Sequence, residues 1–137
     1  MKTKNSNSNN NFANEIDEII KNIAIDAANI EKIGATLLSF GYSTFIQASN
    51  IDILEALDTN TTGTTSFDIL VFGQRFTVLG YLLLYIAAVK RLNEKTLANL
   101  YEDEENNLLV FETIKNSYLG SLLLNSLRLV EFIKLLE

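Results

Sequence analysis

Apolar residues recur at helical spacing along three segments of the chain, and polar runs separate these segments. From residue 13 to residue 57 the apolar positions follow the period of an α-helix, and no proline interrupts them. The run 58–65 is rich in Thr, Asn and Asp and contains Gly63, which is typical of a turn. A second helical pattern covers residues 66–101, with Ser66 as the expected N-cap, and a third covers residues 108–136. The pattern therefore predicts an all-α fold in which three long antiparallel helices form a single bundle over residues 13–137.

The first predicted helix is long, and the segment before it is polar. Residues 1–12 are mainly Asn, Ser and Lys, and they have too few apolar side chains to offset the entropy of ordering. We therefore expect a disordered tail at 1–12. A straight helix over residues 13–57 would measure roughly 65 Å. A kink near Gly41 is an alternative, and it would divide this segment and give four helices.

Small residues recur at every seventh position of the first two predicted helices. Larger apolar side chains stand three positions further on, which is the a/d pattern of a heptad. A glycine inside a helix costs roughly 1 kcal/mol relative to alanine. Close approach of two backbones can offset this cost through dispersion contacts and weak Cα–H bonds to carbonyl oxygens. We predict a helix-packing interface, either within the chain or between chains, at Ala27, Gly34, Gly41, Ala48, Gly73, Gly80, Ala87 and Gly120.

The two glycine pairs lie in a short internal repeat. Ile33-Gly34 and Phe40-Gly41-Tyr42 align with Phe72-Gly73 and Leu79-Gly80-Tyr81, which indicates a duplicated helical unit. Apolar-Gly dipeptides at this spacing resemble those of small uncharacterised glycine-heptad repeat proteins from Gram-positive bacteria, over about residues 30–90. Those proteins carry more copies of the dipeptide, and the resemblance implies no activity.

The amino-acid composition excludes most familiar types of active site. The chain has no Cys and no His, so thiolate nucleophiles, disulfides, Cys-ligated metal sites and the usual general base near neutral pH are all missing. Its net charge is −6 and its eleven Lys and Arg residues are scattered, which argues against binding to nucleic acid. We therefore expect no enzymatic activity, no cofactor, no metal site and no nucleic-acid partner.

Two uncharged stretches keep a membrane location open as an alternative. No charge occurs between Lys32 and Asp52 or between Arg75 and Lys90, so a helical hairpin over about residues 33–89 could span a bilayer. Against this, the first helix carries a polar stripe, and Arg75 lies within the second. We favour a cytoplasmic bundle, because a polar run occupies the place of an apolar signal stretch.

Arg75 is the candidate for a structural ion pair. It is the one Lys or Arg between Lys32 and Lys90, and its expected partners are carboxylates near the turn, namely Asp52, Glu55 or Asp68. Exposure of its charged head to solvent is the alternative.

The sequence thus favours a non-enzymatic helical packing or interaction module that associates with itself or with a protein partner. A homo-oligomer or a complex with a protein partner is the expected form. The alternative is a small membrane protein of immunity or holin type with the hairpin at 33–89.

Overall fold

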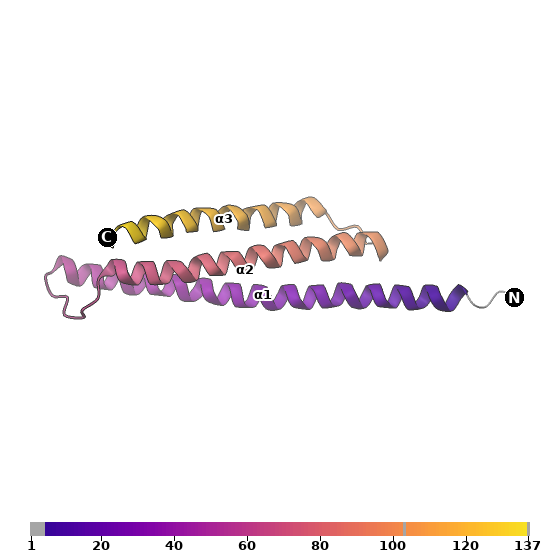
Figure 1. Cartoon of the computed structure of the whole chain (residues 1–137), viewed down its shortest axis with the longest axis horizontal. Coiled ribbons are helices and arrows are strands. Elements are labelled where there is room, and N and C mark those ends of the chain that lie inside the picture. Colours follow the sequence, from indigo (N-terminus) through magenta and orange to yellow (C-terminus); the bar gives the residue numbers. More distant parts are fainter. Residues whose placement is uncertain (1–4, 103, 137) are drawn as a thin grey trace.

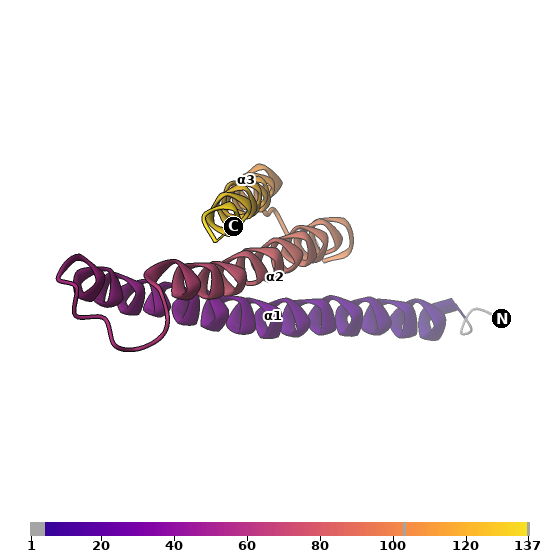
Figure 2. The same ribbon diagram turned by 60° about the vertical axis from the view of Figure 1, so that its left-hand side comes forward.

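The computed structural model describes residues 5–102 and 104–136, and it is built from three helices (Figure 1). They are α1 (Asn5–Ala56), α2 (Ser66–Tyr101) and α3 (Leu108–Lys134). Successive helices run antiparallel, and α2 lies between the other two in both views (Figures 1 and 2). The prediction of an all-α bundle is confirmed, since the described residues form no strand and α2 packs against both α1 and α3.

The bundle is open on one side. Within the described part of the chain, α1 and α3 make no backbone contact with each other, so α2 supplies the contacts to both. An open arrangement of this kind leaves each helix with surface that no other element covers.

Helix α1 is longer than the pattern predicted. It begins at Asn5, so residues 5–12 continue the helix where we expected a disordered tail; residues 1–4 of that tail lie outside the described residues. Extending an existing helix adds one hydrogen bond for each residue fixed, which favours continuation in a segment without proline. The ring of Phe12 also lies edge-on to the ring of Tyr101, with the two ring centroids 6.4 Å apart. Helix α1 continues through Gly41 to Ala56 without a break, so the described residues form three helices and not four.

The turn between α1 and α2 is held by capping side chains. Thr65 is the N-cap of α2, and its side chain accepts a hydrogen bond from the backbone N–H of Asp68 at 3.1 Å. The Asp68 carboxylate accepts in return from the Thr65 backbone N–H, which completes a capping box and lowers the pKa of Asp68. Ser66, the expected cap, instead donates from its backbone and its hydroxyl to the Glu55 carboxylate, at 3.1 and 2.8 Å.

Helix α3 is joined to α2 by a buried polar pair. Gln74 of α2 is fully buried, and its Nε2 donates to the backbone carbonyl and to Oδ1 of Asn125 on α3, at 2.9 and 3.0 Å. Asn125 in turn donates to the carbonyl of Ser121. Buried amides are costly without partners, so this pair fixes the alignment of α3 on α2.

Candidate interaction surface

Helices α1 and α2 touch through the backbones of four glycines. A Cβ built on Gly34 would stand 3.0 Å from the carbonyl oxygen of Gly80, and one built on Gly41 would stand 2.8 Å from that of Gly73. The reverse constructions, on Gly80 and on Gly73, each give 2.9 Å to the opposite glycine's carbonyl oxygen. These distances are too short for a side chain. The two helices therefore approach as closely as their backbones allow, and this contact is within the chain.

Alanines beyond the glycines extend the line of small residues along which α1 and α2 touch, which we call the contact line. Ala27, Ala48 and Ala87 are at most 1% exposed. Two threonines not predicted for the interface also lie in it, and both are buried. The hydroxyl of Thr44 donates to the carbonyl of Gly41, and that of Thr77 donates to the carbonyl of Gly73. Their polar groups are satisfied within their own helices, so the contact line stays free of unpaired donors.

Gly120 does not take part in this kind of contact. A Cβ built on it would meet nothing within 4 Å, and the residue is only half-buried. Its prediction as a packing residue is therefore wrong. The spacing alone could not reveal this, because α3 turns a different face, including Asn125, toward α2.

Arg75 also differs from its prediction. It is exposed, and it forms no ion pair with any residue that the structure describes. Two of its expected partners are engaged elsewhere, Glu55 with Ser66 and Asp68 with Thr65. The charged head of Arg75 is exposed to solvent, which was the alternative.

The ion pairs across α1 and α2 lie at the other end of the hairpin. Arg91 donates to both carboxylate oxygens of Glu31, at 3.1 and 3.2 Å, and to Glu94, which is buried. The hydrogen bond to Glu31 raises the pKa of Arg91. Lys90 pairs with Asp26 at 2.7 Å. Sequence reasoning missed these pairs because the partners lie about sixty residues apart, and no local spacing connects them.

One flank of the α1–α2 hairpin is apolar and uncovered. We call it the open face; its residues are Ile33 and Phe40 of α1 and Phe72, Phe76, Leu79 and Ile86 of α2. At its centre the ring of Phe40 lies edge-on to those of Phe76 and Phe72, with centroids 4.8 and 6.2 Å apart. Apart from the half-buried Phe76, these side chains are 36% to 55% exposed. They form a patch, not isolated apolar residues of the kind found on every surface.

The open face lies on the opposite side of α2 from α3. A helix turns by about 100° per residue, so residues two apart point roughly 160° away from each other. Gln74, which bonds to α3, is two residues from Phe72 and two from Phe76. Helix α3 therefore covers the flank that the open face does not use. No element among the described residues covers the open face.

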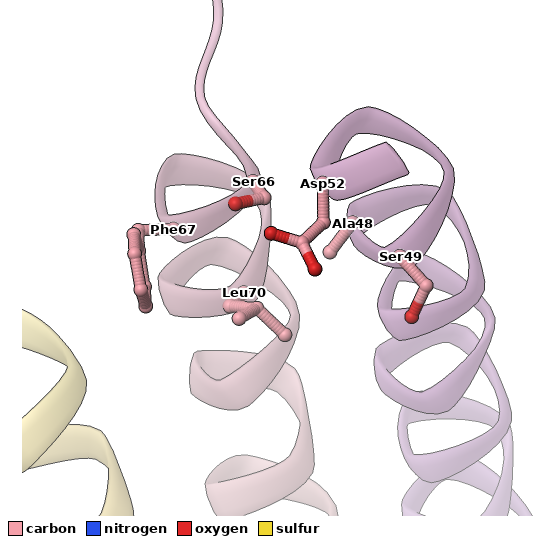
Figure 3. A pocket seen from close by; sticks show the side chains of 6 residues that line it. All are labelled: Ala48, Ser49, Asp52, Ser66, Phe67 and Leu70. Atoms are coloured by element: carbon pink, nitrogen blue, oxygen red, sulfur yellow. The ribbon is translucent and has the colours of Figure 1, made fainter. Parts of the chain in front are cut away.

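The hollows on the surface of the described residues include three of moderate volume. The smallest, about 160 Å³, lies where α1 ends and α2 begins; Figure 3 shows the carboxylate of Asp52 turned toward Ser66 beside the small side chain of Ala48. A second, of about 250 Å³, has Glu31 and Arg91 at its edge. The largest, about 420 Å³, adjoins the open face through Ile33 and is otherwise lined by Asn29, Lys32, Thr36 and Leu37.

Comparison of the sequence and structure with protein-family models, with curated proteins and with solved structures finds no match. Across the described ranges, no group of three carboxylates could hold a metal ion. Helix α2 is the one described helix long and apolar enough to cross a membrane, and a third of its most apolar stretch is buried against its neighbours. A central helix of a soluble bundle can have the same length and apolar character.

Proposed function

We propose that this protein is a non-enzymatic helical interaction module that associates, through apolar helix surface, with another copy of itself or with a protein partner. The observation that carries this proposal is the open face, where an aromatic cluster stands exposed on a hairpin of closely packed helices. A patch of this kind is as large as the largest apolar patch on a typical monomer, and such patches often have a function in binding.

The size of the open face supports the proposal. With side chains of roughly 200 Å² each, the exposed fractions leave on the order of 500 Å² of apolar surface. Covering it would contribute about 12 kcal/mol at 25 cal/mol per Å², before the costs of association are subtracted. A gain of this size is comparable to the cost of association, about 4–15 kcal/mol, and a preformed surface lowers that cost.

The small-residue heptad of α1 and α2 has a supporting role in this proposal. Because the glycines bring two backbones into contact, the hairpin presents the open face on a rigid frame. A rigid surface loses less conformational entropy on binding than a flexible one. The heptad is thus the framework of the module, and the flank beside it is the binding surface.

The test compares the wild-type chain with a Phe72→Ser/Leu79→Ser variant in the cells that produce it. Chemical crosslinking should give discrete protein adducts for the wild type and should lose them in the variant. A matched variant on the outer side of α3, Leu123→Ser/Leu127→Ser, changes side chains that are at least as exposed and should keep the adducts. The same adducts in all three chains would refute the open face as the binding surface.

A small membrane protein with a hairpin over residues 33–89 is the second candidate, because α2 has the length and apolar character of a membrane span. Fractionation without detergent separates the two candidates. An interaction module should remain in the supernatant after a high-speed spin, whereas a chain that stays in the pellet after a carbonate wash would support the membrane hairpin and refute the first proposal.

A further inference from the structure

We infer that the open face is covered by the open face of a second copy, so that the protein is a two-fold symmetric dimer. This inference rests on the proposed function and names the partner. In the dimer the α1–α2 hairpins of two chains stack face to face and form a central four-helix bundle. The two α3 helices lie on its outer sides, because α3 packs on the flank of α2 away from the open face.

The first support is the amount of surface that the chain exposes. Its accessible surface is 9371 Å². A compact monomer of 15.3 kDa is expected to expose roughly 7,100 Å². The open three-helix arrangement therefore leaves an excess on the order of 2,000 Å². A standard interface removes about 800 Å² from each partner, so a dimer fits within this excess.

The second support is the apolar content of the open face. About 65% of a homodimer interface is non-polar, which means roughly 500 Å² on each partner of a standard-size contact. The open face supplies an apolar area of this order. The polar residues beside it, Asn29, Lys32 and Thr36, provide the hydrophilic rim that such interfaces have.

The third support is charge. The α2 part of the open face, from Phe72 to Ile86, contains one charged residue, Arg75, and the α1 part has none between Lys32 and Asp52. The charges at its end, Asp26 and Lys90, are already paired within the chain. Lys32 and Arg75 are exposed beside the open face and form no ion pair among the described residues. The apolar side chains of the open face carry no charge themselves, so they can face their own copy without repulsion. The net charge of −6 also disfavours anionic lipid headgroups as the alternative occupant.

A two-fold axis makes a specific prediction for cysteine crosslinking. Each residue near the axis faces its own copy, and the distance between equivalent residues grows away from the axis. The chain has no native Cys, so a single introduced thiol reports one position. Under mild oxidation, the single variants Phe72→Cys, Leu79→Cys and Ile86→Cys should form disulfide-linked dimers. The yield of linked dimer should be highest for the position nearest the two-fold axis and lower for the others. Leu123→Cys, on the outer side of α3, should stay monomeric.

The second measurement is the mass of the purified full-length chain in solution, by light scattering and sedimentation, at protein concentrations up to about 0.1 mM. At that concentration, a dimer with a Kd tighter than about 10 µM keeps most chains dimeric. The wild type should have twice the mass of 15.3 kDa. Leu79→Glu should reduce it to one chain with unchanged helicity, and Leu123→Glu should leave it dimeric. Leu79 and Leu123 are matched in residue type and are 48% and 58% exposed.

The outcomes separate this inference from the proposed function. A monomeric wild type, or a dimer that only Leu123→Glu dissociates, overturns the two-fold dimer. If the dimer is overturned but the Phe72→Ser/Leu79→Ser variant loses the crosslinked adducts seen in cells, the proposed function is kept and the partner is another protein. The wild-type protein should not cosediment with vesicles of phosphatidylcholine, with or without phosphatidylglycerol. If it does bind these vesicles and Leu79→Glu abolishes the binding, then lipid covers the open face and the dimer is overturned. If Leu79→Glu fails to fold, the crosslinking series decides alone.

Discussion

Replacing Gly41 by alanine tests the close approach of α1 and α2 directly. The new Cβ would lie 2.5 Å from Oγ1 of Thr77, 2.8 Å from the carbonyl oxygen of Gly73 and 3.0 Å from the backbone nitrogen of Thr77. Two of these atoms belong to the α2 backbone, so a change of side-chain rotamer cannot relieve the overlap. The helices would have to separate by roughly 0.5 Å to restore ordinary contact distances.

The magnitude follows from two opposing effects. Overpacking of this kind costs about 1–3 kcal/mol, and the upper half of the range applies because backbone atoms must move. Alanine returns about 1 kcal/mol through its higher helix propensity. We therefore expect Gly41→Ala to lower the free energy of unfolding by about 1–2 kcal/mol.

Gly120→Ala is the matched control. It is the same substitution in a helix interior, but the added Cβ meets nothing within 4 Å. Only helix propensity should act there, so this variant should gain up to about 1 kcal/mol. At roughly 4 °C per kcal/mol, the two variants should differ in Tm by about 10 °C when melting is followed by circular dichroism at one fixed protein concentration. If both substitutions raise the Tm by similar amounts, backbone contact does not hold the hairpin together.

Three further changes test other contacts. Thr65→Ala removes half of the capping box and should lower the free energy of unfolding by about 1 kcal/mol in urea; an unchanged midpoint would contradict a role for the cap. Gln74→Leu removes the donor to Oδ1 of Asn125, and Asn125→Leu leaves Nε2 of Gln74 with only the backbone carbonyl of residue 125, so each should lower the free energy of unfolding by about 1–2 kcal/mol. The double variant should approach the wild type, and a double-mutant cycle without coupling would refute this. The hydrogen bond with Tyr42 raises the pKa of Tyr81 to about 12 from 10.0, so this bond stabilises the fold below pH 10 and is lost as the pH rises through the range from 10 to 12. Tyr42→Phe should therefore lower the pKa of Tyr81 in a tyrosinate absorbance titration, and an unchanged pKa of Tyr81 among the four remaining tyrosines would exclude the bond.

The positions of the helices could be predicted because they depend on local periodicity. Helix α2 has the predicted bounds, residues 66–101, because a clear turn and a clear polar run flank it. The start of α1 was predicted less well, since helix extension is cooperative and depends on the turns that follow it. The N-cap was misplaced by one residue. Thr65 and Ser66 are equivalent as caps locally, and Glu55, eleven residues before Ser66, decides between them.

The candidate surface depended more on tertiary structure. The spacing pointed to Gly34, Gly41, Gly73 and Gly80, but it could not distinguish them from Gly120, whose environment depends on how α3 is turned. The heptad also leaves a flank of the α1–α2 hairpin on each side of the glycine contact, and the sequence pattern does not show which of these flanks α3 covers. Exposure of the open face is therefore a property of the assembled chain, not of any segment.

The glycine contacts between α1 and α2 are periodic, and a periodic contact cannot define its own alignment. If α2 slid by seven residues, about 10 Å, Gly34 would meet Gly73 and small residues would still face each other. What distinguishes the observed alignment from its shifted copies lies beside the contact line, in the Arg91–Glu31 pair and the Phe40–Phe76 rings, and in the short connection of residues 57–65. Small residues set the distance between the two helices, and these irregular contacts select one register among several that the glycines alone would accept.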